Sequence, residues 1–213
     1  MTEINNLQLK EFIDKTNSKE PVPGGGGIAA AVGSLGAALS GMVCHLTTGK
    51  KKYAEYEEDI QKILKKSTEL SEKLFFEINE DAKNFSKLME CFSLPKETEK
   101  EKNKRQEKVQ NGLKLSAKAP IEIVKLSYET ILLLDELSKK GSKMAISDVG
   151  CAAAASKASL NMAWLNVKVN LKSIKDTNFN ENVEKELIPI IKKGNEISDN
   201  VYNNVLKELV WPN

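Results

Sequence analysis

The stretch from Gly27 to Cys44, which reads GIAAAVGSLGAALSGMVC, contains no charged residue, although 29% of the chain is Asp, Glu, Lys or Arg. Most of its residues are small, and small residues let the backbones of neighbouring helices approach closely. A helix that has no polar face has to be covered on all sides. We therefore expect this stretch to be a central helix on which the rest of the chain packs.

The same stretch has about the minimum length of a transmembrane helix, so a membrane span has to be weighed. Ala, Gly and Ser contribute little to membrane insertion, and no Lys or Arg lies between Lys19 and Lys50 to anchor the ends. The first residues, MTEINNLQLKEF, lack the basic and apolar segments of a signal peptide. We expect a cytoplasmic protein that does not span a membrane.

The three cysteines, Cys44, Cys91 and Cys151, are odd in number and far apart in the sequence. This usage suits a reducing compartment and predicts neither a disulfide framework nor a metal site. The formal net charge of +2 is small, so composition gives no reason to expect binding to nucleic acid.

Nearly every other segment has the 3.6-residue hydrophobic period of a helix, without strand-like alternation between turn residues. We expect one all-α domain over residues 1–213, a helical bundle with long helices and two buried, small-residue-rich helices. Gly49 and Gly141 are expected to end helices, Pro120 to lie in a first turn and Pro189 to kink the last helix. The expected helices are 7–15, 27–48, 53–92 as one helix or two collinear ones, 98–117, one that runs from about 120 to 141, 149–172 and 181–209. Because an uncharged helix needs covering, we also expect a homodimer.

Four glycines, Gly24, Gly25, Gly26 and Gly27, open the first small-residue helix directly after a Pro-Val-Pro sequence. Glycines leave the backbone N–H groups uncrowded, and the start of a helix favours negative charge, so this glycine run can hold an anion or a carbonyl group. It is not a P-loop, because no Lys-Ser/Thr follows, and not a dinucleotide motif, because no strand precedes it. A flexible connection between two helices is the alternative.

Further candidates lie along the second small-residue helix. Asp148 stands at its start, either as an N-cap or as a functional carboxylate. Asn161, Asn166 and Asn170 follow on the same helix, and the last two share a face at i, i+4 spacing. Such amides suit a flat ligand with an array of hydrogen-bond donors and acceptors.

Other titratable candidates lie outside that helix. Lys50, Lys51 and Lys52 follow the first small-residue helix and form either a solvated turn or a site for a carboxylate-rich ligand. His45, the single histidine, could act as a general base, although a lone helical histidine is more often a packed or capping residue. Asp81 is by default a surface charge. None of these residues decides the function by itself.

Three segments together resemble the formiminotetrahydrofolate cyclodeaminase and methenyltetrahydrofolate cyclohydrolase family. They are PVPGGGGIAAAVGSLGAALSGMV followed by LTTGKKKY, then EDAKNFSKLMECFSLPK, and then SDVGCAAAASKASLNMAWLNVKVNL. The resemblance extends from about residue 5 to about residue 205, with the segments in the expected order and spacing. It implies an all-helical, dimeric enzyme without a metal or nucleotide cofactor.

The resemblance also implies a tetrahydrofolate substrate that carries a one-carbon unit. One reaction of the family closes N5-formiminotetrahydrofolate to 5,10-methenyltetrahydrofolate with loss of ammonia, and the other hydrolyses the methenyl form to 10-formyltetrahydrofolate. Both pass through a tetrahedral carbon between N5 and N10, where an acid or a base has to move a proton. No formiminotransferase domain is attached to this chain, so we expect the cyclohydrolase reaction. The cyclodeaminase reaction and a non-catalytic helical scaffold are the alternatives.

By its match to the family's motifs, Asp148 is the first choice for the catalytic carboxylate and Asp81 is the second. Lys50 is expected to act as an acid or, with the two lysines that follow, to contact the glutamate tail of the substrate. The residues expected to bind the substrate are Gly24, Gly25, Gly26, Gly27, Lys51, Lys52, Ser147, Asn166 and Asn170.

Overall fold

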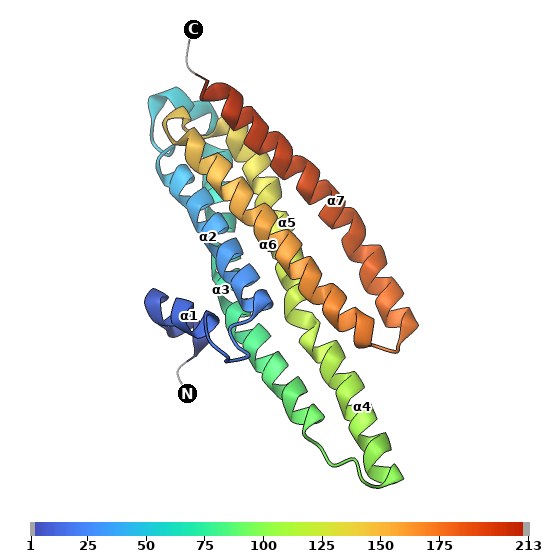
Figure 1. The fold of residues 1–213 in the computed structure, drawn as a ribbon. Coiled ribbons are helices and arrows are strands. Elements are labelled where there is room, and N and C mark those ends of the chain that lie inside the picture. Colours follow the sequence, from blue (N-terminus) through green and yellow to red (C-terminus); the bar gives the residue numbers. More distant parts are fainter. Residues whose placement is uncertain (1–2, 211–213) are drawn as a thin grey trace.

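The computed structural model describes residues 3–210, which form seven α-helices and three short 3-10 helices without a strand (Figure 1). In chain order these elements are η1 (Ile4–Asn6), α1 (Leu9–Thr16), α2 (Gly25–His45), η2 (Lys51–Tyr56), α3 (Glu57–Phe92), α4 (Glu99–Ser116), α5 (Lys118–Lys140), η3 (Lys143–Ala145), α6 (Ile146–Ser173) and α7 (Thr177–Glu208). The all-helical bundle expected from the sequence is therefore confirmed.

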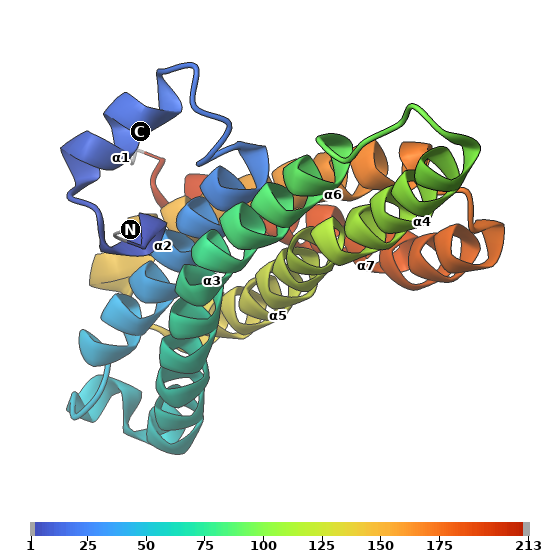
Figure 2. The same ribbon diagram turned by 90° about the horizontal axis from the view of Figure 1, so that it is seen from below.

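The two small-residue helices, α2 and α6, lie side by side and pack on α3, α5 and α7 (Figure 1). They run antiparallel, because Gly25 at the start of α2 lies against Asn166 in the second half of α6, whereas Gly36 lies against Ser156 in its first half. After a loop, helix α4 turns back and lies beside the end of α3, and α1 lies outside the bundle (Figure 2). This arrangement places the start of α2 between α3 and α6.

Close approach between α2 and α6 depends on glycine. The Ser159 hydroxyl donates a hydrogen bond to the Ala29 carbonyl oxygen at 2.7 Å. A Cβ atom on Gly33 would come within 2.5 Å of the Ser159 hydroxyl oxygen, and one on Gly36 would come within 2.6 Å of that of Ser156. Larger residues at these two positions would push the helices apart, which explains why this part of the sequence is so rich in small residues.

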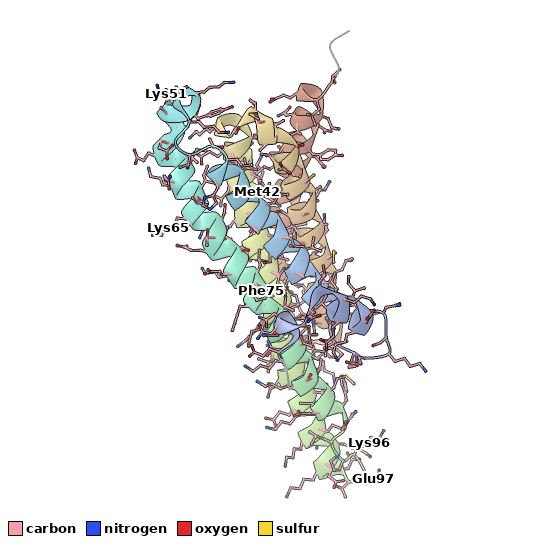
Figure 3. The ribbon with its side chains drawn as sticks, turned by 90° about the vertical axis from the view of Figure 1, so that its left-hand side faces the viewer. Met42, Lys51, Lys65, Phe75, Lys96 and Glu97 are labelled. Carbon is pink, nitrogen blue, oxygen red and sulfur yellow. The ribbon has the colours of Figure 1, made fainter. Side chains whose placement is uncertain are left out.

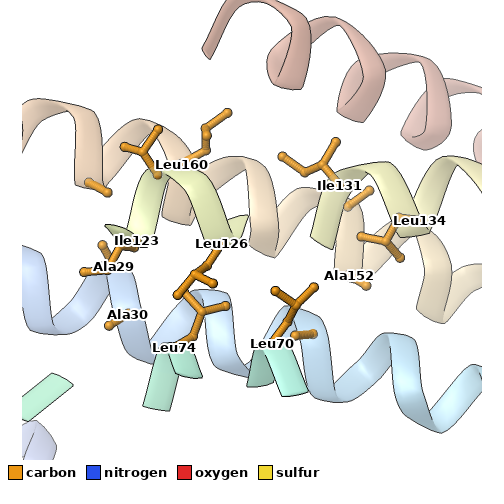
Figure 4. Close-up of a cluster of buried hydrophobic side chains, with 14 of the residues drawn as sticks. Ala29, Ala30, Leu70, Leu74, Ile123, Leu126, Ile131, Leu134, Ala152 and Leu160 are labelled. Atoms are coloured by element: carbon orange, nitrogen blue, oxygen red, sulfur yellow. The ribbon is translucent and has the colours of Figure 1, made fainter. Parts of the chain in front are cut away.

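The hydrophobic core lies between the α2–α6 pair and the helices behind it. Figure 4 shows large side chains of α3 and α5 beside alanines of α2 and α6. Full burial of each such side chain stabilises the fold by roughly 1.5–3 kcal/mol. Fully buried examples are Leu70, Leu74, Ile123, Ile131, Leu134 and Leu160.

Helix α2 is the one helix among residues 3–210 that has the length and mean hydropathy, 1.7, of a membrane-spanning segment. Within the structure, 61% of its most apolar window is buried in the bundle. The core helix of a soluble protein meets the same criterion, so length and composition are weak support for a membrane span.

Helix boundaries differ from the predicted ones by a few residues. Helix α2 ends at His45, earlier than expected, although Gly49 has the positive φ of 72° that suits a residue beyond a helix end. Helix α7 begins earlier than expected, because Asp176 caps it by accepting a hydrogen bond from the Phe179 N–H at 3.0 Å. Pro189 lies inside α7, which is one continuous helix. The segment predicted from residue 53 onward divides into η2 and a single long α3.

Candidate active site

The start of α2 presents free backbone donors. Its N-cap residue, Gly24, has an extended backbone (φ −100°, ψ −164°) and provides no side-chain cap. The Ile28 N–H donates to the Gly24 carbonyl oxygen at 3.0 Å, so the N–H groups of the three preceding glycines have no partner within the helix. The peptide bond between Val22 and Pro23, just before the glycine run, is cis. This helix end can therefore donate hydrogen bonds to a ligand or to a carboxyl group.

Asp81, on α3, supplies a carboxyl group at this helix end. A Cβ atom on Gly26 would lie 2.1 Å from Asp81 Oδ1, so the carboxyl group lies directly against the Gly26 backbone. Asp81 is half-buried, and burial raises the pKa of its carboxyl group to about 6, an effect that a hydrogen bond from the Gly27 backbone opposes. Such a group can accept and return a proton near neutral pH. The default assignment of Asp81 as a surface charge is therefore wrong.

Asn166 approaches the same helix end from α6. A Cβ atom on Gly25 would lie 3.0 Å from Asn166 Nδ2. The Asn166 amide donates to the Met162 carbonyl oxygen at 2.9 Å, and the Asn170 amide donates to the Asn166 carbonyl oxygen at 2.9 Å. The structure thus brings the glycine run, Asp81 and Asn166 together, with Asn170 one helical turn farther along α6.

Asn161 is not part of this group. Its side chain exchanges hydrogen bonds with that of Asn195 on α7, at 2.7 and 3.0 Å. Of the three asparagines along α6, Asn161 therefore pairs with α7, and Asn166 is the one that lies against the glycine run.

The remaining expected site residues lie at the opposite end of the α2–α6 pair. Lys50, Lys51 and Lys52 follow the end of α2, are exposed, and form no ion pair within residues 3–210. Figure 3 labels Lys51 at this end of the molecule. Ser147 and Asp148 lie in the first turn of α6, which is next to the end of α2.

A single chain does not place Asp148 beside Asp81. Asp148 and Asn166 belong to one helix, whose rise of about 1.5 Å per residue separates them by roughly 27 Å. Asp148 is also not the N-cap of α6, because Ala145 occupies that position. Within the first turn, its negative charge still interacts favourably with the helix dipole. His45, the last residue of α2, is exposed at the same end of the molecule.

Glu77 is a titratable residue that the sequence motifs do not single out. It lies one helical turn before Asp81 on α3. Burial is the main cause that raises the pKa of its carboxyl group to about 7, and the negative charges of Glu122, Glu80 and Asp81 add to the shift. In the sequence, Glu77 stands four residues before Asp81, a spacing that puts both side chains on one face of a helix. That spacing does not show that Glu77 is buried. Within residues 3–210, no cluster of three or more His, Cys, Asp or Glu side chains is arranged to hold a metal ion.

Comparison with known proteins gives consistent matches. The family model for formiminotransferase-cyclodeaminase matches residues 8–188. The chain is 39% identical over 200 residues to a methenyltetrahydrofolate cyclohydrolase of Methylorubrum extorquens, covering 94% of this chain and 96% of that protein. It is 29% identical over 186 residues to the formimidoyltransferase-cyclodeaminase of Mus musculus, covering 87% of this chain and 34% of that protein. A solved structure of a formiminotetrahydrofolate cyclodeaminase from Thermotoga maritima superposes with a TM-score of 0.80 at 29% identity, covering 97% of this chain and 98% of that one.

Proposed function

The chain belongs to the formiminotransferase-cyclodeaminase family, and we propose that it is a methenyltetrahydrofolate cyclohydrolase, which hydrolyses 5,10-methenyltetrahydrofolate to 10-formyltetrahydrofolate. The match over nearly the whole length of both proteins to the Methylorubrum extorquens cyclohydrolase carries this choice. The chain spans only about a third of the length of the formimidoyltransferase-cyclodeaminases that it matches.

In the proposed reaction, water adds to the cationic carbon between N5 and N10. We assign Asp81, as a carboxylate, to remove a proton from the attacking water. The carbon is then tetrahedral and carries a hydroxyl group. Asp81 delivers its proton to N5, the bond between the carbon and N5 breaks, and the hydroxyl proton passes to water as the formyl C=O forms on N10. One water molecule is consumed and one proton is released.

The position of Asp81 supports this assignment. Its pKa of about 6 leaves it largely ionised at neutral pH, while it still binds a proton well enough to return it. The Gly27 N–H already bonds to Asp81, whereas the Gly25 and Gly26 N–H groups beside this carboxyl group have no partner within the helix and can hold a carbonyl oxygen of the substrate. Asn166 and Asn170 offer amide oxygens for the pterin ring from α6.

Formiminotetrahydrofolate cyclodeaminase activity is a second candidate, supported by the likeness to the solved Thermotoga maritima protein of that name. In that reaction N10 attacks the formimino carbon, and an acid protonates the ammonia that leaves. Protonated Asp81 could serve as this acid, so one site can support both reactions.

We propose further that the protein is a homodimer formed through the outward face of α2 and α6. This α2–α6 face carries six exposed, large apolar side chains: Leu35 and Met42 on α2, Leu165 and Val169 on α6, and Leu46 and Met144 just after α2 and just before α6. Along α2, no charged residue interrupts it from Gly25 to Leu46. Exposed apolar surface of this kind is typical of an interface between subunits.

A twofold axis in the plane of this face and perpendicular to α2 would place opposite ends of the two chains side by side. The end with Lys50 and Asp148 in one subunit would then face the glycine run and Asp81 of the other. This arrangement accounts for why the residues that match the family's motifs occupy both ends of one uncharged face. We assign Lys50 and Asp148 to a site that the two subunits complete together.

The proposed activity is tested with purified protein by following the absorbance of the methenyl group. Loss of 5,10-methenyltetrahydrofolate above the spontaneous rate is expected, with 10-formyltetrahydrofolate as the product. Appearance of the methenyl absorbance from N5-formiminotetrahydrofolate, without the first activity, would instead select the cyclodeaminase. No change with either substrate overturns the enzyme assignment and leaves the scaffold alternative.

A further inference from the structure

Two side-chain hydroxyl groups join the turn of residues 50–52, called the lysine turn below, to the chain that leads into α6. The Ser142 N–H donates a hydrogen bond to the Thr47 hydroxyl oxygen at 2.9 Å. The Lys143 N–H donates one to the Tyr53 hydroxyl oxygen, also at 2.9 Å. Thr47 and Tyr53 lie on either side of the lysine turn, so the two bonds connect it to a segment 95 and 90 residues away in the sequence.

Both acceptor side chains are buried. The exposed fraction is 1% for Thr47 and 8% for Tyr53. The Thr47 hydroxyl also donates to the Val43 carbonyl oxygen at 2.7 Å, which holds it at the end of α2. A backbone N–H group in such surroundings is unfavourable without an acceptor. The two hydroxyl groups therefore determine where the chain enters α6.

Tyr53 also contacts the lysine turn itself. Its backbone N–H donates to the Lys50 carbonyl oxygen at 2.9 Å, and the Lys52 ammonium group lies 5.6 Å from the centre of its ring. The hydrogen bond from the Lys143 N–H is the main cause that lowers the pKa of the Tyr53 hydroxyl, and the charges of Lys52 and Lys50 add to the shift. One side chain thus touches both the lysine turn and the entry to α6.

The entry to α6 is rigidly connected to Asp148. The short helix η3 begins at Lys143 and is followed directly by α6, and Asp148 lies in the first turn of α6. No loop separates the Lys143 N–H from Asp148, so a shift of the backbone at Lys143 would move Asp148 with it. Small displacements of a group that acts on a substrate have large effects on rate.

We propose that Tyr53 and Thr47 are positioning residues, which hold Asp148 and the lysine turn together as one half of the active site. They act through the Lys143 and Ser142 N–H groups and do not touch the substrate. The assignment rests on the proposed function, because Asp148 and Lys50 are placed there in a site that two subunits complete.

Single variants measure the effect on the reaction. Tyr53→Phe removes only the hydroxyl group and is expected to lower kcat/KM for 5,10-methenyltetrahydrofolate by about 10- to 100-fold. Thr47→Val should act in the same direction, and Thr47→Ser, which retains the hydroxyl group, should restore most of the loss. The matched control is Tyr56→Phe, the same change at a half-buried tyrosine of η2, which should keep full activity.

Mixed dimers give a readout that a general loss of stability would not produce. When Tyr53→Phe is refolded with Asp81→Asn, one site of each mixed dimer carries both changes and the other carries none, so about a quarter of the wild-type activity should return. When it is refolded with Asp148→Asn, both sites of each mixed dimer carry a change in the same half. This second mixture should therefore stay near the activity of its parent variants.

The outcomes separate this assignment from the proposed function. An active wild type with an equally active Tyr53→Phe overturns the positioning role alone, as does a return of activity with Asp148→Asn or none with Asp81→Asn. A wild type that is inactive with both folate substrates overturns the proposed function and the positioning role with it. Should Tyr53→Phe fail to fold, the comparison of Thr47→Val with Thr47→Ser in the same mixtures decides the result.

Discussion

The Asp81 carboxyl group occupies the space that a side chain on Gly26 would need, since Asp81 Oδ1 lies 2.1 Å from the ideal Cβ position of that glycine. At this point α2 and α3 are so close that only a hydrogen atom fits between the glycine backbone and the carboxyl group. The contact ties the packing of two helices to the position of the proposed acid–base group.

Gly26→Ala is expected to displace Asp81 and to lower kcat/KM for 5,10-methenyltetrahydrofolate by about 10²-fold, because small misplacements of a catalytic group have effects of this size. The matched control is Gly41→Ala on the same helix, where the new methyl group would lie 3.8 Å from Leu64 and 3.9 Å from Ser67. The control should keep full activity and gain about 0.5–1 kcal/mol in free energy of unfolding. Equal activity of the two variants would remove the Gly26 contact from the mechanism.

The pH dependence of kcat/KM should report on Asp81. Because burial raises the pKa of its carboxyl group to about 6, the group is protonated and unable to act as a base below that pH. We expect kcat/KM to fall about tenfold for each pH unit below 6 and to level off above it. In Asp81→Asn this dependence should disappear, together with a loss in rate of about 10²–10⁴-fold. An unchanged profile in the variant would assign the proton transfer to another residue.

The stability of the fold should change with pH through the same group. A carboxyl group whose folded-state pKa is raised contributes stability that is complete below its unfolded pKa, 3.8, and is lost as the pH rises through about 6. Asp81→Asn removes this loss, so the variant should be more stable than the wild type at pH 7.5, by up to about 3 kcal/mol. Near pH 4 the difference should become small. Urea unfolding of both proteins at the two pH values measures it, and a variant less stable at pH 7.5 would show that hydrogen bonding outweighs burial.

The helical bundle was predictable from the sequence, because the hydrophobic period and the glycines and prolines at helix ends determine where each helix forms without reference to distant residues. The sequence also predicted that the two small-residue helices are central, since an uncharged helix such as α2 has few other places to lie. The spacing of the motifs did not predict that α2 and α6 pack antiparallel. Because they do, the start of α6 with Asp148 lies far from the start of α2, where Asp81 lies. The burial of Asp81 was also hidden, since it depends on a contact with Gly26, which is distant in the sequence.

Replacing a glycine of α2 by alanine should destabilise the fold where the glycine lies against α6, and should not do so where there is room for a methyl group. A methyl group at Gly33 would come within 2.5 Å of the Ser159 hydroxyl, which already donates to Ala29. Gly33→Ala is therefore expected to lower the free energy of unfolding by about 1–3 kcal/mol. Gly41→Ala is again the control, and its effect should have the opposite sign. Equal effects in urea unfolding would show that helix propensity rather than close packing selects glycine in α2.

A site completed by two subunits predicts that two inactive variants restore each other. Asp81→Asn and Asp148→Asn homodimers should each lose most activity, because every site lacks one of the two carboxylates. When the two variants are unfolded together and refolded as a mixture, about half of the dimers contain one chain of each kind. In these, one site carries both substitutions and the other carries none, so about a quarter of the wild-type activity should return. Light scattering on the same samples checks that the protein is a dimer. If mixing restores nothing although dimers form, the two residues do not share a site across the α2–α6 face, and if Asp148→Asn alone is fully active, Asp148 lies outside the site.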